Sequence, residues 1–142
     1  MAELKPFVRK INYYETDQMH IVHHSNYVRF FEEARLDIMD QYGYDYRKIE
    51  EMGIIIPVLY VKADFKKPAR YGDTIEIVAK LIKIKGLKFA YSYEIYNQET
   101  KELLVTGESG HAFLDKDLKP VRLKKDYPEL YEFMQMAAKD CE

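Results

Sequence analysis

The sequence contains little cysteine and no tryptophan. Its single cysteine, Cys141, excludes an internal disulfide and gives no sign of an oxidising compartment. Cys141 is also a poor candidate nucleophile, because residues so near a chain end are usually mobile. No apolar run is long enough to span a membrane, and no basic segment followed by an apolar one marks a signal peptide. These absences predict a soluble cytoplasmic protein with no membrane partner.

An excess of basic residues is absent as well. The 22 Lys and Arg residues face 24 Asp and Glu residues, for a net charge of −2, whereas nucleic-acid-binding modules usually carry a clear positive excess. We therefore expect no nucleic-acid partner. No internal repeat, low-complexity tract or Gly/Ser linker divides the chain, which predicts one domain over residues 1–142. The 13 tyrosines suit half-buried sheet faces, subunit interfaces and ligand-binding walls.

Strand-like alternation and helical periodicity divide the chain into expected elements. A long helix is expected to begin at an N-cap at Ser25 or Asn26 and to end at Gly43. The other expected elements are, in chain order, a strand at 7–13, a short helix capped by Asp45 that ends near Gly53, strands at 54–66, 74–85, 87–97 and 102–115, and a short helix capped by Asp126. One strand, a long helix and then four long strands in meander order indicate an α+β fold.

The long helix is predicted to be amphipathic, with its apolar side chains within an arc of about 180°. That arc contains Tyr27, Phe30, Phe31, Ala34, Ile38, Met39 and Tyr42. Arg35 also lies within it and is expected to extend its charge to solvent or to pair with a carboxylate. Such a wide face needs a twisted antiparallel sheet that curves around the helix. One strand is expected to present Phe89, Tyr91, Tyr93 and Ile95 on a single face.

The segment between the first strand and the long helix holds most of the candidate chemistry. It contains Glu15, Asp17 and three of the four histidines, namely His20, His23 and His24. The helix that follows directs free backbone N–H groups and the positive end of its dipole towards this segment. Such donors stabilise an oxyanion while an opposing carboxylate attacks or activates water, so Asp17 is the candidate catalytic group. The simpler alternative for Asp17 is a turn carboxylate bonded to its own backbone.

Two motifs carry a resemblance to a known family. The first is Thr16-Asp17, then two residues, His20, the apolar pair Ile21-Val22, and a helix that opens with Asn26-Tyr27. The second, less specific motif is Pro-Ala-Arg-Tyr-Gly-Asp at 68–73. Both motifs, and the order and length of the elements, resemble the 4-hydroxybenzoyl-CoA thioesterase-like branch of the hotdog family over nearly the whole chain.

The resemblance implies a hotdog fold, in which an antiparallel sheet of five or six strands wraps around one long helix. It also implies a homodimer or homotetramer with paired sheet edges and active sites at the dimer interface. The implied activity is acyl-CoA thioester hydrolysis without a metal or organic cofactor. Asp17 would be the nucleophile or general base, and the backbone N–H of His24 the oxyanion donor.

The same resemblance implies a set of substrate-binding residues. They are His20, Asn26, Tyr27, Lys66 and Arg70. Lys67, Lys83, Lys85 and Lys88 are further candidates to meet the CoA phosphates. His20 departs from the family pattern, which usually has glycine there. A position that glycine normally fills can require a left-handed backbone or a close approach to the ligand, so we expect His20 to influence substrate preference.

Several alternatives compete with this interpretation. The spacing of His20, His23 and His24 is compatible with metal ligands, but no second cluster follows except the lone His111. Ser25 is better explained as a helix cap than as a nucleophile, because no Gly-x-Ser-x-Gly motif is present. A non-catalytic acyl-CoA-binding module on the same fold is the main functional alternative. A dehydratase is less well supported, since its Asp-then-His signature is not found.

Overall fold

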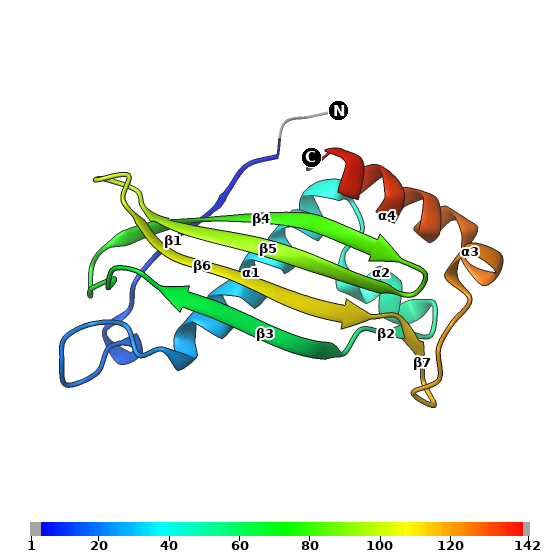
Figure 1. Ribbon diagram of the computed structural model, residues 1–142, viewed down its shortest axis with the longest axis horizontal. Coiled ribbons are helices and arrows are strands. Elements are labelled where there is room, and N and C mark those ends of the chain that lie inside the picture. The colour runs from blue at the N-terminus through cyan, green and yellow to red at the C-terminus, as the bar shows by residue number, and fades with distance from the viewer. Residues whose placement is uncertain (1–3, 141–142) are drawn as a thin grey trace.

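The computed structural model describes residues 4–140, which form one curved sheet, a long helix on one face of it and shorter helices at one end (Figure 1). The elements are β1 (Phe7–Lys10), the 3-10 helix η1 (Tyr13–Glu15), α1 (Ser25–Tyr42), α2 (Tyr46–Glu51), β2 (Ile54–Ile55), β3 (Val58–Phe65), β4 (Thr74–Lys85), β5 (Lys88–Asn97), β6 (Leu103–Ala112), β7 (Leu114–Asp115), α3 (Leu123–Asp126) and α4 (Pro128–Asp140). This is the α+β arrangement that the sequence predicts.

The order of strands in the sheet differs from the predicted meander. The five-stranded antiparallel sheet has the order β1-β4-β5-β6-β3, so only β4, β5 and β6 follow one another as a meander. β3 pairs with β6, from Val58 opposite His111 to Phe65 opposite Val105. The 66–73 connection therefore crosses from one side of the sheet to the other instead of making a hairpin. That crossing brings the connection beside the segment between β1 and α1.

Two predicted strands are each divided in the structure. The strand expected at 54–66 becomes β2 and β3, separated at Pro57, which has no N–H to give to a ladder. The strand expected at 102–115 becomes β6 and β7, and β7 leaves the main sheet to pair with β2. The strand expected at 7–13 ends at Lys10 and continues as η1.

Helix ends are predicted well except at two N-termini. Gly43 ends α1 with φ 84°, and Asp45 caps α2 by accepting a hydrogen bond from the Lys48 N–H at 3.0 Å. The N-cap of α1 is His24, one residue before the predicted range. Asp126 belongs to α3 rather than capping α4, because Pro128 begins the last helix, where its lack of an N–H costs nothing.

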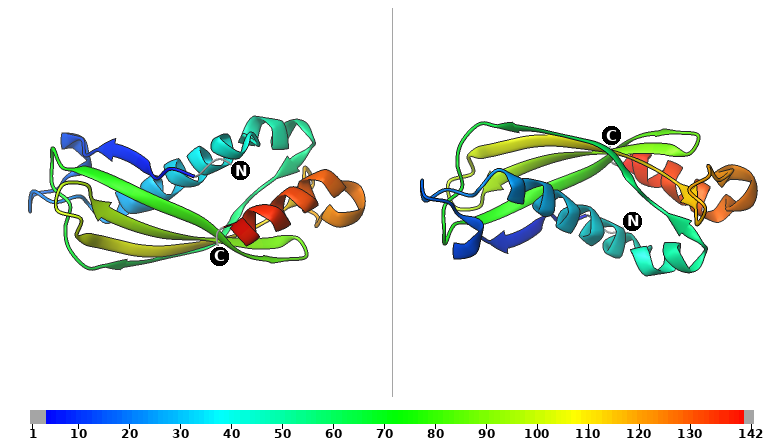
Figure 2. Two further views of the ribbon diagram at one scale, coloured as in Figure 1. Left: turned by 90° about the horizontal axis from the view of Figure 1, so that it is seen from above. Right: turned by 90° about the horizontal axis from the view of Figure 1, so that it is seen from below.

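The core lies between α1 and the concave face of the sheet, as the helical wheel predicts (Figure 2). Phe31 and Tyr93 stack there with ring centroids 4.3 Å apart and planes 8° apart. The contact requires glycine at Gly107, since a Cβ atom at this position would lie 2.4 Å from the Phe31 ring. The helix therefore approaches the middle of the sheet more closely than any side chain on β6 would allow.

Arg35 neither extends its charge to solvent nor forms a close ion pair. Its guanidinium is buried and donates to the Tyr93 hydroxyl at 3.4 Å, and the nearest Glu32 oxygen is 4.0 Å away. The chain of contacts continues from Tyr93 Oη to Ser109 Oγ at 2.5 Å and on to His111 Nε2 at 2.7 Å. A line of polar groups thus crosses an otherwise apolar core.

β3 is an edge strand whose other side is unpaired in residues 4–140. Nearly all of its residues are exposed, including the apolar side chains of Val58, Leu59, Tyr60, Val61 and Phe65. The exposed fractions of Leu59 and Phe65 are 50% and 56%. A long apolar edge strand of this kind is a template for pairing with another strand.

Candidate active site

Asp17 lies in a tight loop between η1 and α1 that is closed by backbone hydrogen bonds. The Asp17 N–H donates to the Ile21 carbonyl at 3.0 Å, and the His20 N–H donates to the Asp17 carbonyl at 2.9 Å. One oxygen of the Asp17 carboxylate, Oδ1, accepts a bond from the Met19 N–H at 2.8 Å. The other oxygen accepts no hydrogen bond from residues 4–140. The loop therefore holds the carboxylate through one oxygen and leaves the other available.

His20 closes this loop with a left-handed backbone, φ 66°. The unusual backbone expected at position 20 is therefore confirmed. A non-glycine residue in this region pays a steric penalty of about 1–2 kcal/mol. The imidazole is exposed and turns away from the core.

The loop is fixed to the start of α1 through one carbonyl group. The Glu15 carbonyl accepts from the His23 N–H at 2.9 Å and from the Asn26 side-chain Nδ2 at 2.9 Å. Asn26 is 6% exposed, so its amide is committed to this internal contact. The sequence predicts a substrate-binding role for Asn26, whereas the geometry gives it the role of positioning Asp17 relative to the helix.

Glu15 itself is buried, and its carboxylate is anchored by two groups. Its carboxylate accepts from the Asn12 N–H at 2.8 Å and from the Arg9 guanidinium at 2.5 Å. Arg9 also bonds Glu33 on α1 and lies 4.4 Å above the Phe30 ring. Sequence reasoning missed this cluster, because a Glu and an Arg six residues apart carry no signal that both will be buried together.

The start of α1 presents a free backbone donor. The N–H groups of Ser25, Asn26 and Tyr27 are bonded to His23 Nδ1, the His23 carbonyl and the His24 carbonyl. The N–H of His24 donates to no group within residues 4–140. The His23 and His24 rings lie 4.2 Å apart and are exposed at the junction of loop and helix. The predicted oxyanion donor is therefore an unpaired amide at the positive end of a long helix.

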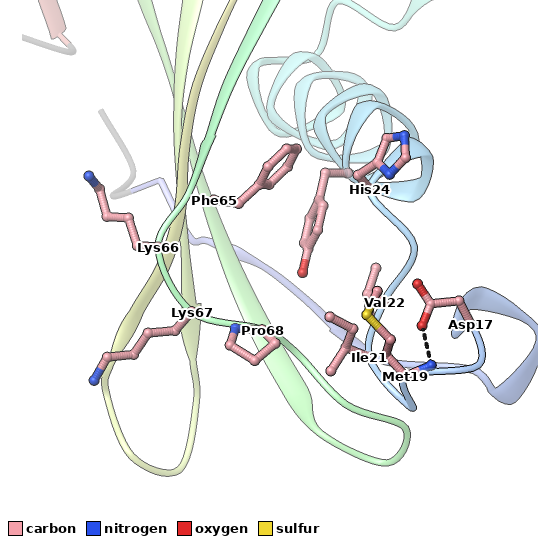
Figure 3. Close-up of a pocket in the computed structure, with 10 residues that line it drawn as sticks. Asp17, Met19, Ile21, Val22, His24, Phe65, Lys66, Lys67 and Pro68 are labelled. Carbon is pink, nitrogen blue, oxygen red and sulfur yellow. Dashed lines mark hydrogen bonds between the residues drawn. The ribbon is translucent and has the colours of Figure 1, made fainter.

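An apolar pocket of about 300 Å³ lies beside this loop (Figure 3). Its lining residues are Asp17, Met19, Ile21, Val22, His24, Tyr27, Phe65, Lys66, Lys67 and Pro68. The Asp17 carboxylate points towards the pocket in Figure 3. The Tyr27 and Phe65 rings lie 5.3 Å apart and form one wall. Burial raises the pKa of Tyr27, so its hydroxyl remains protonated at neutral pH.

Of the predicted basic residues, Lys66 and Lys67 line this pocket. Figure 3 shows the ammonium groups of Lys66 and Lys67 pointing away from Asp17, and Lys67 forms an ion pair with Glu102. Arg70 is exposed and does not line the pocket. Its backbone pairs with Ile21 and so ties the 66–73 connection to the Asp17 loop. Of the three cations, only Lys66 lines the pocket without an ion pair in residues 4–140.

A second hollow of about 480 Å³ also has Asp17 in its lining. It is lined by Tyr13, Thr16, Asp17, Gln18, His20 and Tyr71. The rings of Tyr13 and Tyr71 are 5.6 Å apart and largely exposed. Asp17 thus lines both hollows.

Two further observations concern the described residues as a whole. No group of three or more His, Cys, Asp or Glu side chains within 4–140 is arranged to hold a metal ion. No helix in that range is both long and apolar enough to cross a membrane.

Comparison with known proteins identifies the family. Residues 11–135 match the model of the thioesterase-like superfamily. The chain is 34% identical over 131 residues to YneP of Bacillus subtilis (strain 168), a protein assigned provisionally as an acyl-CoA thioesterase, and the match covers 92% of this chain and 94% of YneP.

Solved structures agree with this match. The DHNA-CoA thioesterase of Staphylococcus aureus superimposes with a TM-score of 0.87 at 33% identity, covering 93% of this chain and 89% of that one. Among the sequence relatives, a 1,4-dihydroxy-2-naphthoyl-CoA hydrolase of Thermosynechococcus vestitus is 28% identical, and the match covers 67% of this chain and 66% of that protein. The hotdog fold expected from the sequence motifs is thereby confirmed, and the chain belongs to the thioesterase-like superfamily as a thioester hydrolase.

Proposed function

We propose that this protein hydrolyses acyl-CoA thioesters and that Asp17 is its catalytic carboxylate. The observation that carries the proposal is the placement of Asp17. Its unbonded carboxylate oxygen borders an apolar pocket, and His24, whose N–H is unpaired within residues 4–140, lines the same pocket. The names of the relatives YneP and the DHNA-CoA thioesterase support CoA esters as the substrate class. A cytoplasmic location and a single domain over 1–142 remain predictions from the sequence.

The proposed chemistry uses only groups of the chain and water. With the thioester carbonyl oxygen at the His24 N–H, Asp17 acts as a general base that takes a proton from water, or as a nucleophile that attacks the carbonyl carbon. The carbonyl oxygen gains negative charge, which the amide and the helix dipole stabilise. Collapse of the tetrahedral intermediate breaks the C–S bond and the CoA thiolate leaves; in the general-base route it takes up the proton that Asp17 accepted from water. In the nucleophilic route, water then hydrolyses the acyl-Asp17 anhydride, and the proton released from that water goes to the thiolate.

Asp17→Asn tests this proposal with little change of shape. The asparagine oxygen can still accept the Met19 N–H, so the loop is expected to keep its conformation. We expect the rate of thiol release from a panel of acyl-CoAs to fall on the order of a hundredfold or more, with binding of the substrate retained. Full activity of Asp17→Asn would exclude Asp17 as the catalytic group.

Two further measurements separate the remaining alternatives. If the wild-type protein binds CoA esters and releases thiol from none of them, it is a non-catalytic acyl-CoA-binding module. A single turnover in H₂¹⁸O with enzyme in excess, followed by mass spectrometry of the product and of Asp17, detects a nucleophilic route in which water attacks the Asp17 carbonyl of the anhydride. That route transfers ¹⁶O from Asp17 to the first product and leaves ¹⁸O in Asp17, whereas a general base always gives a product carboxylate that contains ¹⁸O and leaves Asp17 unlabelled.

We also propose that two copies pair through β3. The strand has one unpaired side and five exposed apolar side chains, which is costly for a monomer in water. Pairing of two β3 strands about a two-fold axis is necessarily antiparallel and would continue the sheet across both copies. Light scattering over a dilution series tests the dimer, and a mass of four subunits would indicate that two such dimers associate.

A further inference from the structure

The turn that follows β7 is rigid and holds a leucine in a strained conformation. The Asp115 carboxylate accepts from the N–H groups of Asp117 at 2.8 Å and Lys119 at 3.0 Å. Two backbone bonds close the same turn, from the Asp115 N–H to the Lys119 carbonyl and from the Leu118 N–H to the Asp115 carbonyl. Leu118 has φ 63° and is 65% exposed. A large apolar side chain is thus held in solvent with an unfavourable backbone.

This turn and the Asp17 loop occupy corresponding places at opposite ends of the sheet. Figure 1 shows both projecting beyond the free edge of β3, the Asp17 loop beyond the Phe65 end and the turn beyond the Val58 end. Seen from the β3 edge, in the right-hand view of Figure 2, both lie on the side of β3 that carries α1. A two-fold axis through the middle of β3 and perpendicular to the sheet exchanges these two ends. It therefore places the turn of one copy beside the Asp17 loop of the other.

The surfaces that would meet are chemically complementary. On the side of the pocket, Met19 is 68% exposed and Phe65 is 56% exposed. On the side of the turn, Leu118 is the projecting apolar group. Asp117 and the two lysines of the turn carry charges that largely cancel with Asp115, so the apolar contact faces no net charge. Contact with Met19 and Phe65 would offset the cost of holding Leu118 exposed and strained.

We propose that the partner subunit's Leu118 completes the wall of the pocket beside Asp17 and contributes to the choice of acyl group. The pocket is open on the side of Met19 and Phe65 in one copy, so an apolar acyl group there would remain in contact with water. A leucine from the second copy closes that side and limits the room available. This inference rests on the proposed hydrolysis of acyl-CoA and on the β3 dimer.

Leu118→Gly separates this role from a structural one. Glycine adopts φ 63° without steric cost, and this gain partly offsets the loss of the leucine contact, so the thermal midpoint is expected to change little. Loss of the leucine side chain from the pocket is expected to raise KM for apolar acyl-CoAs roughly tenfold, an effect the size of one buried leucine. Lys101→Gly is the matched control, because Lys101 has φ 64° in an exposed turn and does not line the pocket. It relieves the same backbone strain and should leave KM unchanged.

Mixed dimers test whether Leu118 acts across the interface. Asp17→Asn and Leu118→Arg are expected to be nearly inactive as separate homodimers. A heterodimer purified with two different tags has one site with Asp17 and the opposing Leu118 both intact, and we expect about half of the wild-type activity. If Leu118 served the site of its own chain, this heterodimer would stay inactive.

Different negative results distinguish the role of Leu118 from the proposed hydrolysis. Wild-type KM in both Leu118 variants, or a monomer at assay concentration, would overturn the role of Leu118 while leaving the chemistry of Asp17 intact. Failure of the wild-type protein to hydrolyse any acyl-CoA would instead refute the proposed function.

Discussion

His111 is expected to make the stability of this protein sensitive to mild acid. The imidazole on β6 is 1% exposed, its Nε2 contacts Ser109 Oγ at 2.7 Å, and its Nδ1 has no partner in residues 4–140. Burial, and secondarily the positive charge of Arg35, lower the pKa of His111 from 6.5 to about 4. Because Arg35 can only donate, the contacts run from Arg35 to Tyr93 to Ser109 to a His111 that accepts. A protonated His111 would reverse the last of these bonds.

The sign and size of the effect follow from this shift. The folded state holds His111 less well in its protonated form than the unfolded chain does, so stability is full above the unfolded pKa of 6.5 and falls as the pH is lowered towards 4. A difference of about 2.5 pKa units limits the loss to about 3.4 kcal/mol at low pH. Between pH 7 and pH 5 the loss is about 2 kcal/mol.

His111→Gln isolates this contribution from that of the carboxylates. A glutamine can bond Ser109 but does not titrate, and most carboxylates stay ionised at pH 5. We expect denaturant unfolding to show that wild type loses about 2 kcal/mol more than His111→Gln between pH 7 and pH 5. Parallel losses in the two proteins would refute the assignment of a neutral, buried His111. An NMR titration of the imidazole would measure its pKa directly.

Further tests address two backbone positions. Gly107→Ala is expected to destabilise the fold by about 1–3 kcal/mol in denaturant unfolding, because the new Cβ would lie 2.4 Å from the Phe31 ring in the core. Gly110→Ala is its control and should cost less, since its Cβ would meet only the partly exposed Tyr60, which is able to move; equal costs would contradict the reasoning. His20→Gly should raise the free energy of unfolding by up to about 1 kcal/mol through relief of the left-handed backbone. Thermal melts beside Lys101→Gly would check this, and a lower midpoint for His20→Gly would show that its imidazole stabilises the loop.

Periodicity and capping predict the helix and most strands, because those signals are local. The apolar arc of α1 and the stop at Gly43 depend on residues within a few turns of each other. The partner of β3 is not a local property. A run of consecutive strands suggests a meander, but β3 and β4 are not neighbours in the sheet. β5 and β6 lie between them, and the 66–73 connection joins them. The strand that pairs with β3 is determined by contacts between residues that are far apart in the chain.

Some features of the candidate site are likewise predictable from the sequence and others are not. Asp17 and the helix start at His24 are identifiable because a motif holds them at fixed spacing. The anchoring of Glu15 by Arg9 and Asn26 is not, since it depends on one backbone carbonyl and on burial created by the whole fold. The direction of Lys66 is equally inaccessible, because it depends on where β3 ends and how the chain turns afterwards. The sequence therefore predicts which residues belong to the candidate site better than it predicts the direction of their side chains.

The Asp17 loop is held mainly by backbone bonds, and this affects how substrate preference can change. Asp17, His20, Val22 and His23 are each tied by a backbone N–H to a backbone carbonyl. A substitution that alters only a side chain leaves those bonds in place. Positions 18 and 19 can therefore exchange size, charge and shape next to the pockets while Asp17 stays where it is. If Asp17 performs the proposed hydrolysis, single substitutions in this loop are expected to change acyl specificity without disturbing the carboxylate.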